Sequence, residues 1–196
     1  MSDDMPPHRT ELLPSRHLAR NVTVALAVVL LGFFAVLVTS KPRGERAITS
    51  PLLGNPAPAV VSDLVGGGTF DLARRKGSWV VLNFFNSTCV PCINEHPQLI
   101  AFDKSQKDIA GGAELFTVVN DDTDGAVKAF FEKNGGAWPK IRDPDGEISV
   151  AFGVAKVPET WIIDPSGFIR LRIAGEVTSE FLVGKLGELR RALNGS

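Results

Sequence analysis

The stretch that decides the fold is residues 80–97, VVLNFFNSTCVPCINEHP. Its first six residues are almost all apolar, as expected for a central strand that is buried on both faces. Cys89 and Cys92 follow where a helix is expected to begin, and the chain has no other cysteine. Pro91 between them fits the first turn of a helix, where its missing N–H is no loss. The pair is therefore predicted at a strand-to-helix junction.

Two cysteines at this spacing can store two electrons as a disulfide and release them as a dithiol. The N-terminus of a helix offers free N–H groups and the positive end of the helix dipole, which both favour a thiolate. We therefore expect Cys89 to be the nucleophile and Cys92, one turn further on, to be the resolving thiol. A static disulfide across so short a loop would stabilise little, and half a metal site would need ligands from another chain.

Composition excludes several other classes of protein. The chain has 196 residues, with 21 Lys plus Arg and 22 Asp plus Glu, for a net charge of -1. This balance gives no basis for binding nucleic acid. With 2 cysteines and 3 histidines, two of them near the N-terminus, a zinc finger or ribbon is not expected.

The N-terminal region differs from the rest in composition. Residues 21–39 are almost entirely apolar and would span about 28 Å as a helix, close to the thickness of a bilayer core. We predict a cytoplasmic tail at 1–20, a transmembrane anchor at 21–39, a proline-rich linker at 40–58 and a globular domain at 59–193. A cleaved signal peptide is the alternative, although no A-x-A site follows the apolar stretch. Arginine and lysine flank both ends equally, so charge does not set the orientation.

The remaining hydrophobic pattern alternates strands with helices and predicts an α/β sandwich with a mixed sheet. The expected elements are a hairpin at 59–64 and 69–72, a strand at 79–85, a helix at 91–107 interrupted at Pro97, a strand at 113–119, helices at 123–134 and 147–152, strands at 159–163 and 168–173, and a helix at 178–193.

Residues 80–97 resemble the thioredoxin-fold proteins that are tethered in the bacterial periplasm. They are most similar to the cytochrome c maturation reductases (the CcmG/DsbE family), within the broader TlpA-like and ResA-like group. Residues 157–160, Val-Pro-Glu-Thr, resemble the cis-proline loop of that family, and residues 54–72 resemble its N-terminal hairpin. The resemblance covers about residues 52–193 and implies a thioredoxin-like sandwich with a central mixed sheet, an N-terminal hairpin extension and one preceding transmembrane helix.

The resemblance also implies roles for individual residues. Cys89 would attack a client disulfide and Cys92 would resolve the product. Pro158 would be cis and lie against the cysteines, where Val157 would pair with the backbone of the client as an added strand. Glu95, one turn beyond Cys92, would relay a proton, although a solvated helix glutamate is the alternative.

Four other residues qualify this assignment. Asn83 stands where ordinary thioredoxins carry a buried aspartate, and an amide cannot take a proton, so Glu95 is the expected base. Thr88 replaces the tryptophan that usually precedes the first cysteine. The surface around Thr88 on which a client would bind is therefore predicted to be flatter and more polar. Lys156 is hypothesised to favour the Cys89 thiolate and make the couple more oxidising. His96 is expected to be an exposed helix residue.

These features predict a protein thiol-disulfide oxidoreductase with its C-terminal domain in the periplasm and a single anchor in the bacterial inner membrane. Its expected clients are disulfides of apocytochrome c or of a haem-ligation component, and its electrons would come from a transmembrane thiol-disulfide carrier. The Cys89–Cys92 pair is itself the redox centre, so no metal or organic cofactor is expected. The alternatives are a TlpA-like reductant for copper-site cysteines of an oxidase, a net oxidant, and a non-redox module that binds through the thioredoxin groove.

Overall fold

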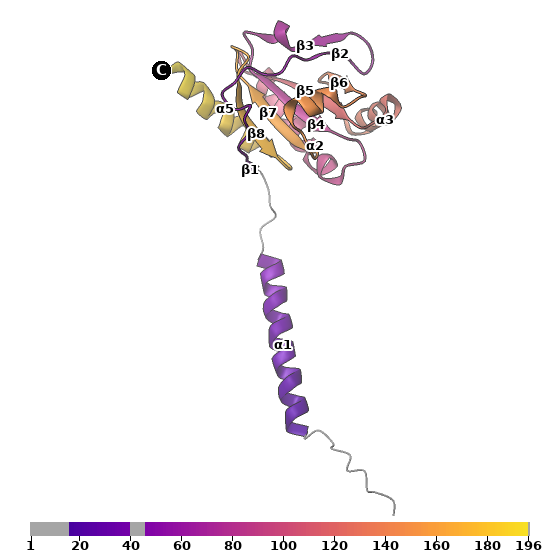
Figure 1. The fold of residues 1–196 in the computed structure, drawn as a ribbon, viewed down its shortest axis with the longest axis vertical. Coiled ribbons are helices and arrows are strands. Elements are labelled where there is room, and N and C mark those ends of the chain that lie inside the picture. The colour runs from indigo at the N-terminus through magenta and orange to yellow at the C-terminus, as the bar shows by residue number, and fades with distance from the viewer. Residues whose placement is uncertain (1–15, 40–45, 196) are drawn as a thin grey trace, which may run out of the picture. The chain divides into compact units, whose positions relative to one another are not determined.

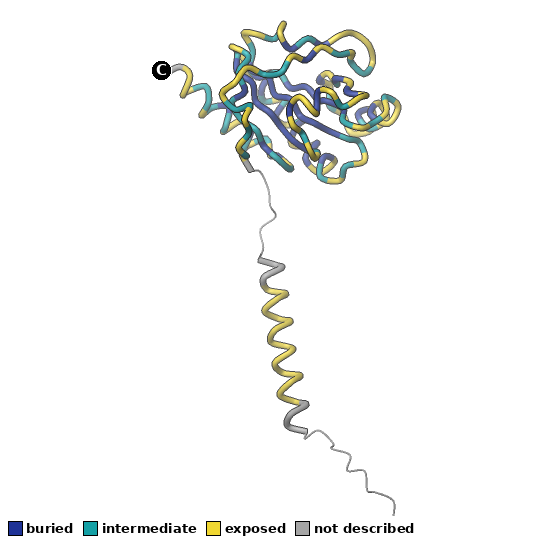
Figure 2. Tube along the Cα trace, in the orientation of Figure 1, coloured by how far each residue is buried: buried dark blue, intermediate teal, exposed yellow. Residues whose placement is uncertain are grey.

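The computed structural model describes residues 16–39 and 46–195. The chain divides into two compact units, one ending at Pro42 and the other beginning at Arg43. The first unit contains helix α1 (Arg16–Thr39), whose described side chains, residues 20–35, are exposed (Figures 1 and 2). Within the described part of the chain, no helix has both the length and the apolar character needed to cross a membrane. The predicted anchor at 21–39 is therefore not confirmed.

The second unit is built on a six-stranded mixed sheet with the order β1-β8-β7-β4-β5-β6 (Figure 1). Strand β4 (Val80–Phe85) is buried along its whole length, as predicted. Its neighbour β5 is parallel to it and β7 is antiparallel, while β6 continues the parallel side and β8 and β1 continue the antiparallel side. The bounds are β1 (Arg46–Ala47), β5 (Glu114–Asn120), β6 (Lys140–Asp143), β7 (Glu159–Ile163) and β8 (Ile169–Ala174).

Helices cover the sheet on both faces because alternate residues of β4 point in opposite directions. Val81 and Phe85 pack in a cluster with apolar residues of α2, α3 and α5, while Val80, Leu82 and Phe84 pack with those of α4 and the hairpin. The helices are α2 (Val90–Lys107), α3 (Asp124–Asn134), α4 (Glu147–Phe152) and α5 (Ser179–Asn194), and a 3-10 helix, η1, spans Leu72–Arg75. This is the predicted sandwich.

The predicted hairpin is present as a separate two-stranded sheet, β2 (Val61–Asp63) with β3 (Thr69–Asp71). The three glycines at its turn, 66–68, all have positive φ angles, which glycine adopts without steric cost. The described part of the segment predicted as a linker also lies on the domain. Strand β1 pairs with β8, and the partly buried Leu52 and Leu53 pack against the core, so these contacts outweigh the proline-rich composition.

One local prediction was wrong, and strand β6 was missed. Helix α2 is continuous through Pro97, which costs one hydrogen bond, because Leu99 and Phe102 beyond it are buried in the core. Strand β6 was not predicted, since its four residues contain a single apolar side chain, Ile141.

Candidate redox site

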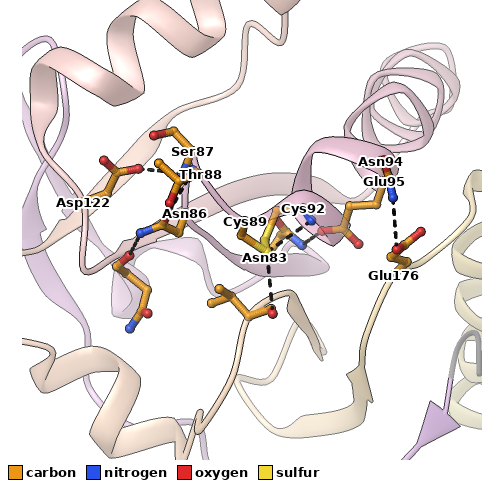
Figure 3. The surroundings of a disulfide bond; sticks show 12 residues. Asn83, Asn86, Ser87, Thr88, Cys89, Cys92, Asn94, Glu95, Asp122 and Glu176 are labelled. Carbon is orange, nitrogen blue, oxygen red and sulfur yellow. Dashed lines mark hydrogen bonds between the residues drawn. A yellow bond between two sulfur atoms is a disulfide. The ribbon is translucent and has the colours of Figure 1, made fainter.

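The two cysteines form a disulfide at the beginning of α2, directly after the loop that leaves β4 (Figure 3). Their Cα atoms are 5.2 Å apart. Cys89 is the N-cap of the helix, and its Sγ accepts the N–H of Cys92 at 3.3 Å. Cys92 is fully buried, whereas Cys89 is partly exposed. Only Cys89 can therefore meet a disulfide on another protein.

The loop before β7 reaches the same place because β7 lies beside β4 in the sheet. The Val157–Pro158 peptide bond is cis, as the resemblance implies. The carbonyl oxygen of Val157 lies 3.7 Å from Cys89 Sγ. The structure thus brings Val157 and Pro158 to the exposed side of the cysteine pair.

A buried carboxyl group, that of Glu95, lies on the inner side of the pair (Figure 3). One oxygen accepts Asn83 Nδ2 at 2.8 Å and the other accepts the backbone N–H of Val177 at 3.0 Å. Burial raises the pKa of Glu95 to about 8, and the charge of Glu176 adds to this, while the bonds from Asn83 and Val177 oppose it. The Glu95 carboxyl group is therefore mostly protonated at neutral pH and ionises as the pH rises through about 8.

Glu95 and Cys92 are three residues apart on one helix, so their side chains share its buried face. A carboxyl group that titrates near neutral pH can accept a proton from a thiol and return it. The arrangement therefore combines an exposed thiol, a buried thiol and a buried proton acceptor. Such a set can carry out disulfide exchange in either direction.

The hydrogen bonds that hold Glu95 include two groups that sequence reasoning missed. Asn83 Nδ2 also donates to the hydroxyl of Thr160 at 3.1 Å, because Asn83 and Thr160 are paired across β4 and β7. Thr160 is the last residue of the Val-Pro-Glu-Thr motif at 157–160, and this motif is the only feature of the sequence that could have indicated its role. The N–H of Val177 is a backbone group, and no residue type could have indicated it.

Thr88 is exposed beside Cys89 on a loop that is held by its own polar groups (Figure 3). The N–H and hydroxyl of Thr88 donate to Asn86 Oδ1 at 2.9 and 2.7 Å. The N–H of Ser87 donates to Asp122 Oδ2 at 2.6 Å, and Asn86 Nδ2 donates to the carbonyl of Asp121 at 2.6 Å. The loop at Thr88 is polar, whereas Val90 beside Cys89 is exposed and apolar, so the flatter and more polar client surface stays a prediction.

The expectation that His96 is exposed was wrong. Only 2% of it is accessible, its Nε2 lies 3.0 Å from the carbonyl oxygen of Gly135, and its ring meets Phe130 and Phe131 edge to face. Burial lowers the pKa of His96, so the ring is neutral at neutral pH. It belongs to the packing of α2 on α3. Lys156 is exposed, and its effect on Cys89 stays a prediction.

The chain is similar to several known proteins. The model of the AhpC/TSA family matches residues 53–172. The thiol:disulfide interchange protein HelX of Rhodobacter capsulatus is 32% identical over 161 residues, covering 81% of this chain and 86% of that protein. The thiol-disulfide oxidoreductase ResA of Bacillus subtilis is 30% identical over 160 residues, covering 82% and 87%. A DsbE homologue of Paracoccus denitrificans is 33% identical over 152 residues, covering 75% and 80%.

Solved structures agree on the fold. The thioredoxin domain of a thiol-disulfide oxidoreductase from Bacteroides vulgatus superposes with a TM-score of 0.62 at 23% identity, covering 71% of this chain and 99% of that domain. The second unit thus has a thioredoxin fold. The chain belongs to the AhpC/TSA family, and within it to the thiol-disulfide oxidoreductases of the HelX, DsbE and ResA type.

Proposed function

We propose that this oxidoreductase is a reductant of protein disulfides in cytochrome c maturation. The observation that carries the proposal is the buried Glu95 carboxyl behind the resolving Cys92, with a pKa of about 8. The proposed clients are the haem-binding cysteines of apocytochrome c or a haem-ligation component that handles them. The resemblance at residues 80–97 and 157–160 supports this choice of client.

The buried carboxyl favours a reductant over an oxidant. A dithiol couple is strongly oxidising when the protein stabilises its reduced, thiolate form. In the fraction of molecules in which Glu95 is ionised, a fraction that grows as the pH approaches 8, its charge disfavours a thiolate on Cys92, because two like charges in a buried site repel. The disulfide is then the favoured form, and the dithiol readily gives its two electrons away.

The proposed reaction has two steps. The Cys89 thiolate attacks a client disulfide, one client cysteine leaves as a thiol after taking a proton from water, and a Cys89–client disulfide forms. Cys92 then passes its proton to the Glu95 carboxylate and attacks Cys89 Sγ, which releases the second client cysteine and closes the Cys89–Cys92 disulfide. In regeneration, dithiol from a transmembrane carrier reverses these steps, and Glu95 returns its proton to Cys92.

We further propose that the domain acts in the periplasm and that residues 21–39 tether it to the inner membrane. The uncharged, apolar composition of this stretch supports the tether, and its last residues lie beyond the described side chains. An oxidising compartment requires a reductant to be selective, and a tether keeps it near its membrane partners. Protease added to intact spheroplasts should remove the domain from the membrane fraction, and a protected or soluble protein would contradict the topology.

The function is tested by deleting the protein from its own cells and measuring two products separately. We expect covalently attached haem in c-type cytochromes to be lost while copper oxidase assembly persists, and wild type but not Cys89→Ser to restore it. Loss of the oxidase with intact c-type cytochromes would favour the TlpA-like alternative. Restoration by Cys89→Ser would favour a non-redox module, and a cellular pool that is mostly disulfide would favour a net oxidant.

A further inference from the structure

The guanidinium group of Arg172 forms hydrogen bonds at both ends of the loop that contains Val157. We call residues 153–158, between α4 and β7, the Val157 loop. Arg172 on β8 donates from Nε and Nη2 to the two carboxylate oxygens of Glu159, at 2.9 and 3.0 Å. The same Nη2 donates to the carbonyl oxygen of Gly153 at 3.1 Å. Gly153 caps α4 and Glu159 begins β7, so Arg172 bridges the residues that bound the loop.

The ion pair is mostly buried, while the bond from Arg172 to Gly153 lies at the surface. The side chain of Glu159 is 3% accessible and that of Arg172 is 16% accessible. Trp161, itself completely buried, donates from Nε1 to Glu159 at 2.7 Å, and its ring centroid lies 5.1 Å from the guanidinium carbon of Arg172. Burying an ion pair is often no more stabilising than burying apolar residues of the same size. This pair therefore calls for a role in addition to stability.

The position of the Val157 loop beside Cys89 indicates that role. The Val157 carbonyl lies 3.7 Å from Cys89 Sγ, while Ala155 and Lys156 before it are exposed. At the other end, the carbonyl of Pro158 accepts the N–H of Gly175 at 3.0 Å. The part of the loop nearest the sulfur is thus placed by the residues that flank it.

We propose that Arg172 is a positioning residue for client recognition: it fixes the Val157 loop so that the main chain of Val157 lies beside Cys89, ready to pair with an extended client segment. This inference rests on the proposed role of Val157 in client binding. The inference predicts that loss of Arg172 affects two classes of disulfide substrate differently. A small aromatic disulfide needs only the Cys89 thiolate, whereas a peptide disulfide also needs the backbone of Val157 in place.

The test compares two substrates with the same leaving group, dithiobis(nitrobenzoate) and a short extended peptide whose central cysteine carries a thionitrobenzoate. The variant is Arg172→Lys, which keeps a positive charge beside Glu159. A single ammonium group cannot hold both carboxylate oxygens and the Gly153 carbonyl as the planar guanidinium does. The matched control is Arg170→Lys, on the same strand, whose Nε bonds the buried Asp164 at 2.6 Å at the end of β7 that lies away from Pro158.

We expect Arg172→Lys to lower the rate of the reduced protein with the peptide by about tenfold and to leave the rate with the small disulfide within about twofold. Arg170→Lys should change neither rate. An equal fall with both substrates, no fall with the peptide, or the same selective fall in Arg170→Lys would overturn the inference. If Arg172→Lys does not fold, Glu159→Gln is the second variant. Its amide oxygen can still accept from Trp161 Nε1 and Arg172 Nε, while its NH2 group removes the acceptor of Arg172 Nη2. The same selective loss, of smaller size, is then expected, and its absence would again overturn the inference.

The wild-type protein distinguishes this inference from the function on which it rests. If it reacts no faster with the peptide than with the small disulfide, the proposed client-binding role of Val157 fails, and the role of Arg172 fails with it. If wild type prefers the peptide and Arg172→Lys keeps that preference in full, only the role of Arg172 fails.

Discussion

Replacing Cys89 by serine is expected to slow disulfide exchange by at least about a thousandfold. A serine hydroxyl at the helix N-terminus is not ionised at neutral pH and cannot attack a disulfide. Cys92 cannot take over, because it is fully buried beneath Cys89. The measurement is the rate at which the reduced protein reacts with dithiobis(nitrobenzoate) at neutral pH, followed by the release of thionitrobenzoate.

Cys92→Ser is the matched control, because it removes the other thiol of the same pair. We expect this variant to keep the first attack and to stop at the mixed disulfide. If Cys92→Ser abolished the first attack and Cys89→Ser preserved it, the two roles would be the reverse of those that the exposure of the cysteines indicates.

Glu95→Gln is expected to slow the release of the mixed disulfide by about a hundredfold, because the Cys92 proton loses its acceptor. The first attack by Cys89 should change little, since Glu95 lies on the buried side of the pair. In wild type the release step should accelerate with pH up to about 8, where Glu95 ionises, and this rise should be absent in the variant. Stopped-flow measurement of both steps across pH resolves them.

The same substitution should change the dependence of stability on pH. The pKa of Glu95 is about 8 in the folded protein, against an ordinary value of 4.5. The folded state therefore binds more protons than the unfolded chain between these values, and wild-type stability falls as pH rises through that window. Glu95→Gln removes this loss, so the oxidised variant should exceed wild type at pH 9 by an amount on the order of a few kcal/mol and differ less at pH 5.

Glu132→Gln, on the exposed surface of α3, is the control for the removal of one carboxylate. Glu132→Gln should release its mixed disulfide at the wild-type rate, and its stability should change between pH 5 and pH 9 as that of wild type does. If Glu95→Gln were no more stable than wild type at high pH, and released its mixed disulfide at the normal rate, two conclusions would fail. Ionisation of Glu95 would not destabilise the fold, and Glu95 would not carry the proton of Cys92.

The sequence predicts the outer part of the site well, because each of its residues lies within a short motif. The spacing of Cys89 and Cys92 at a strand-to-helix junction indicates which thiol is exposed. The motif at 157–160 indicates a loop against that thiol, although these residues are some 65 positions further along the chain. Pairing of β4 with β7 is what brings the two motifs together.

The inner part of the site could not be predicted in the same way. Glu95 is held by Asn83, by Thr160 through Asn83, and by the backbone of Val177. These contacts depend on the packing of α2, β4 and β7 and on the loop between β8 and α5. His96 illustrates the same limit, because a polar residue type suggested exposure while the fold of α3 over α2 buries it. Arg172 has no motif around it. Its link to both ends of the Val157 loop can be recognised only from its bonds to Gly153 and Glu159 in the structure.

The most direct test of disulfide exchange through Cys89 is to isolate its intermediate. Cys92→Ala, expressed in cells that lack the wild-type protein, should accumulate as a covalent complex that is released by a reducing agent, with the client joined to Cys89 in mass spectra of its peptides. Absence of any such complex, while wild type sustains its activity in the same cells, would contradict exchange through Cys89.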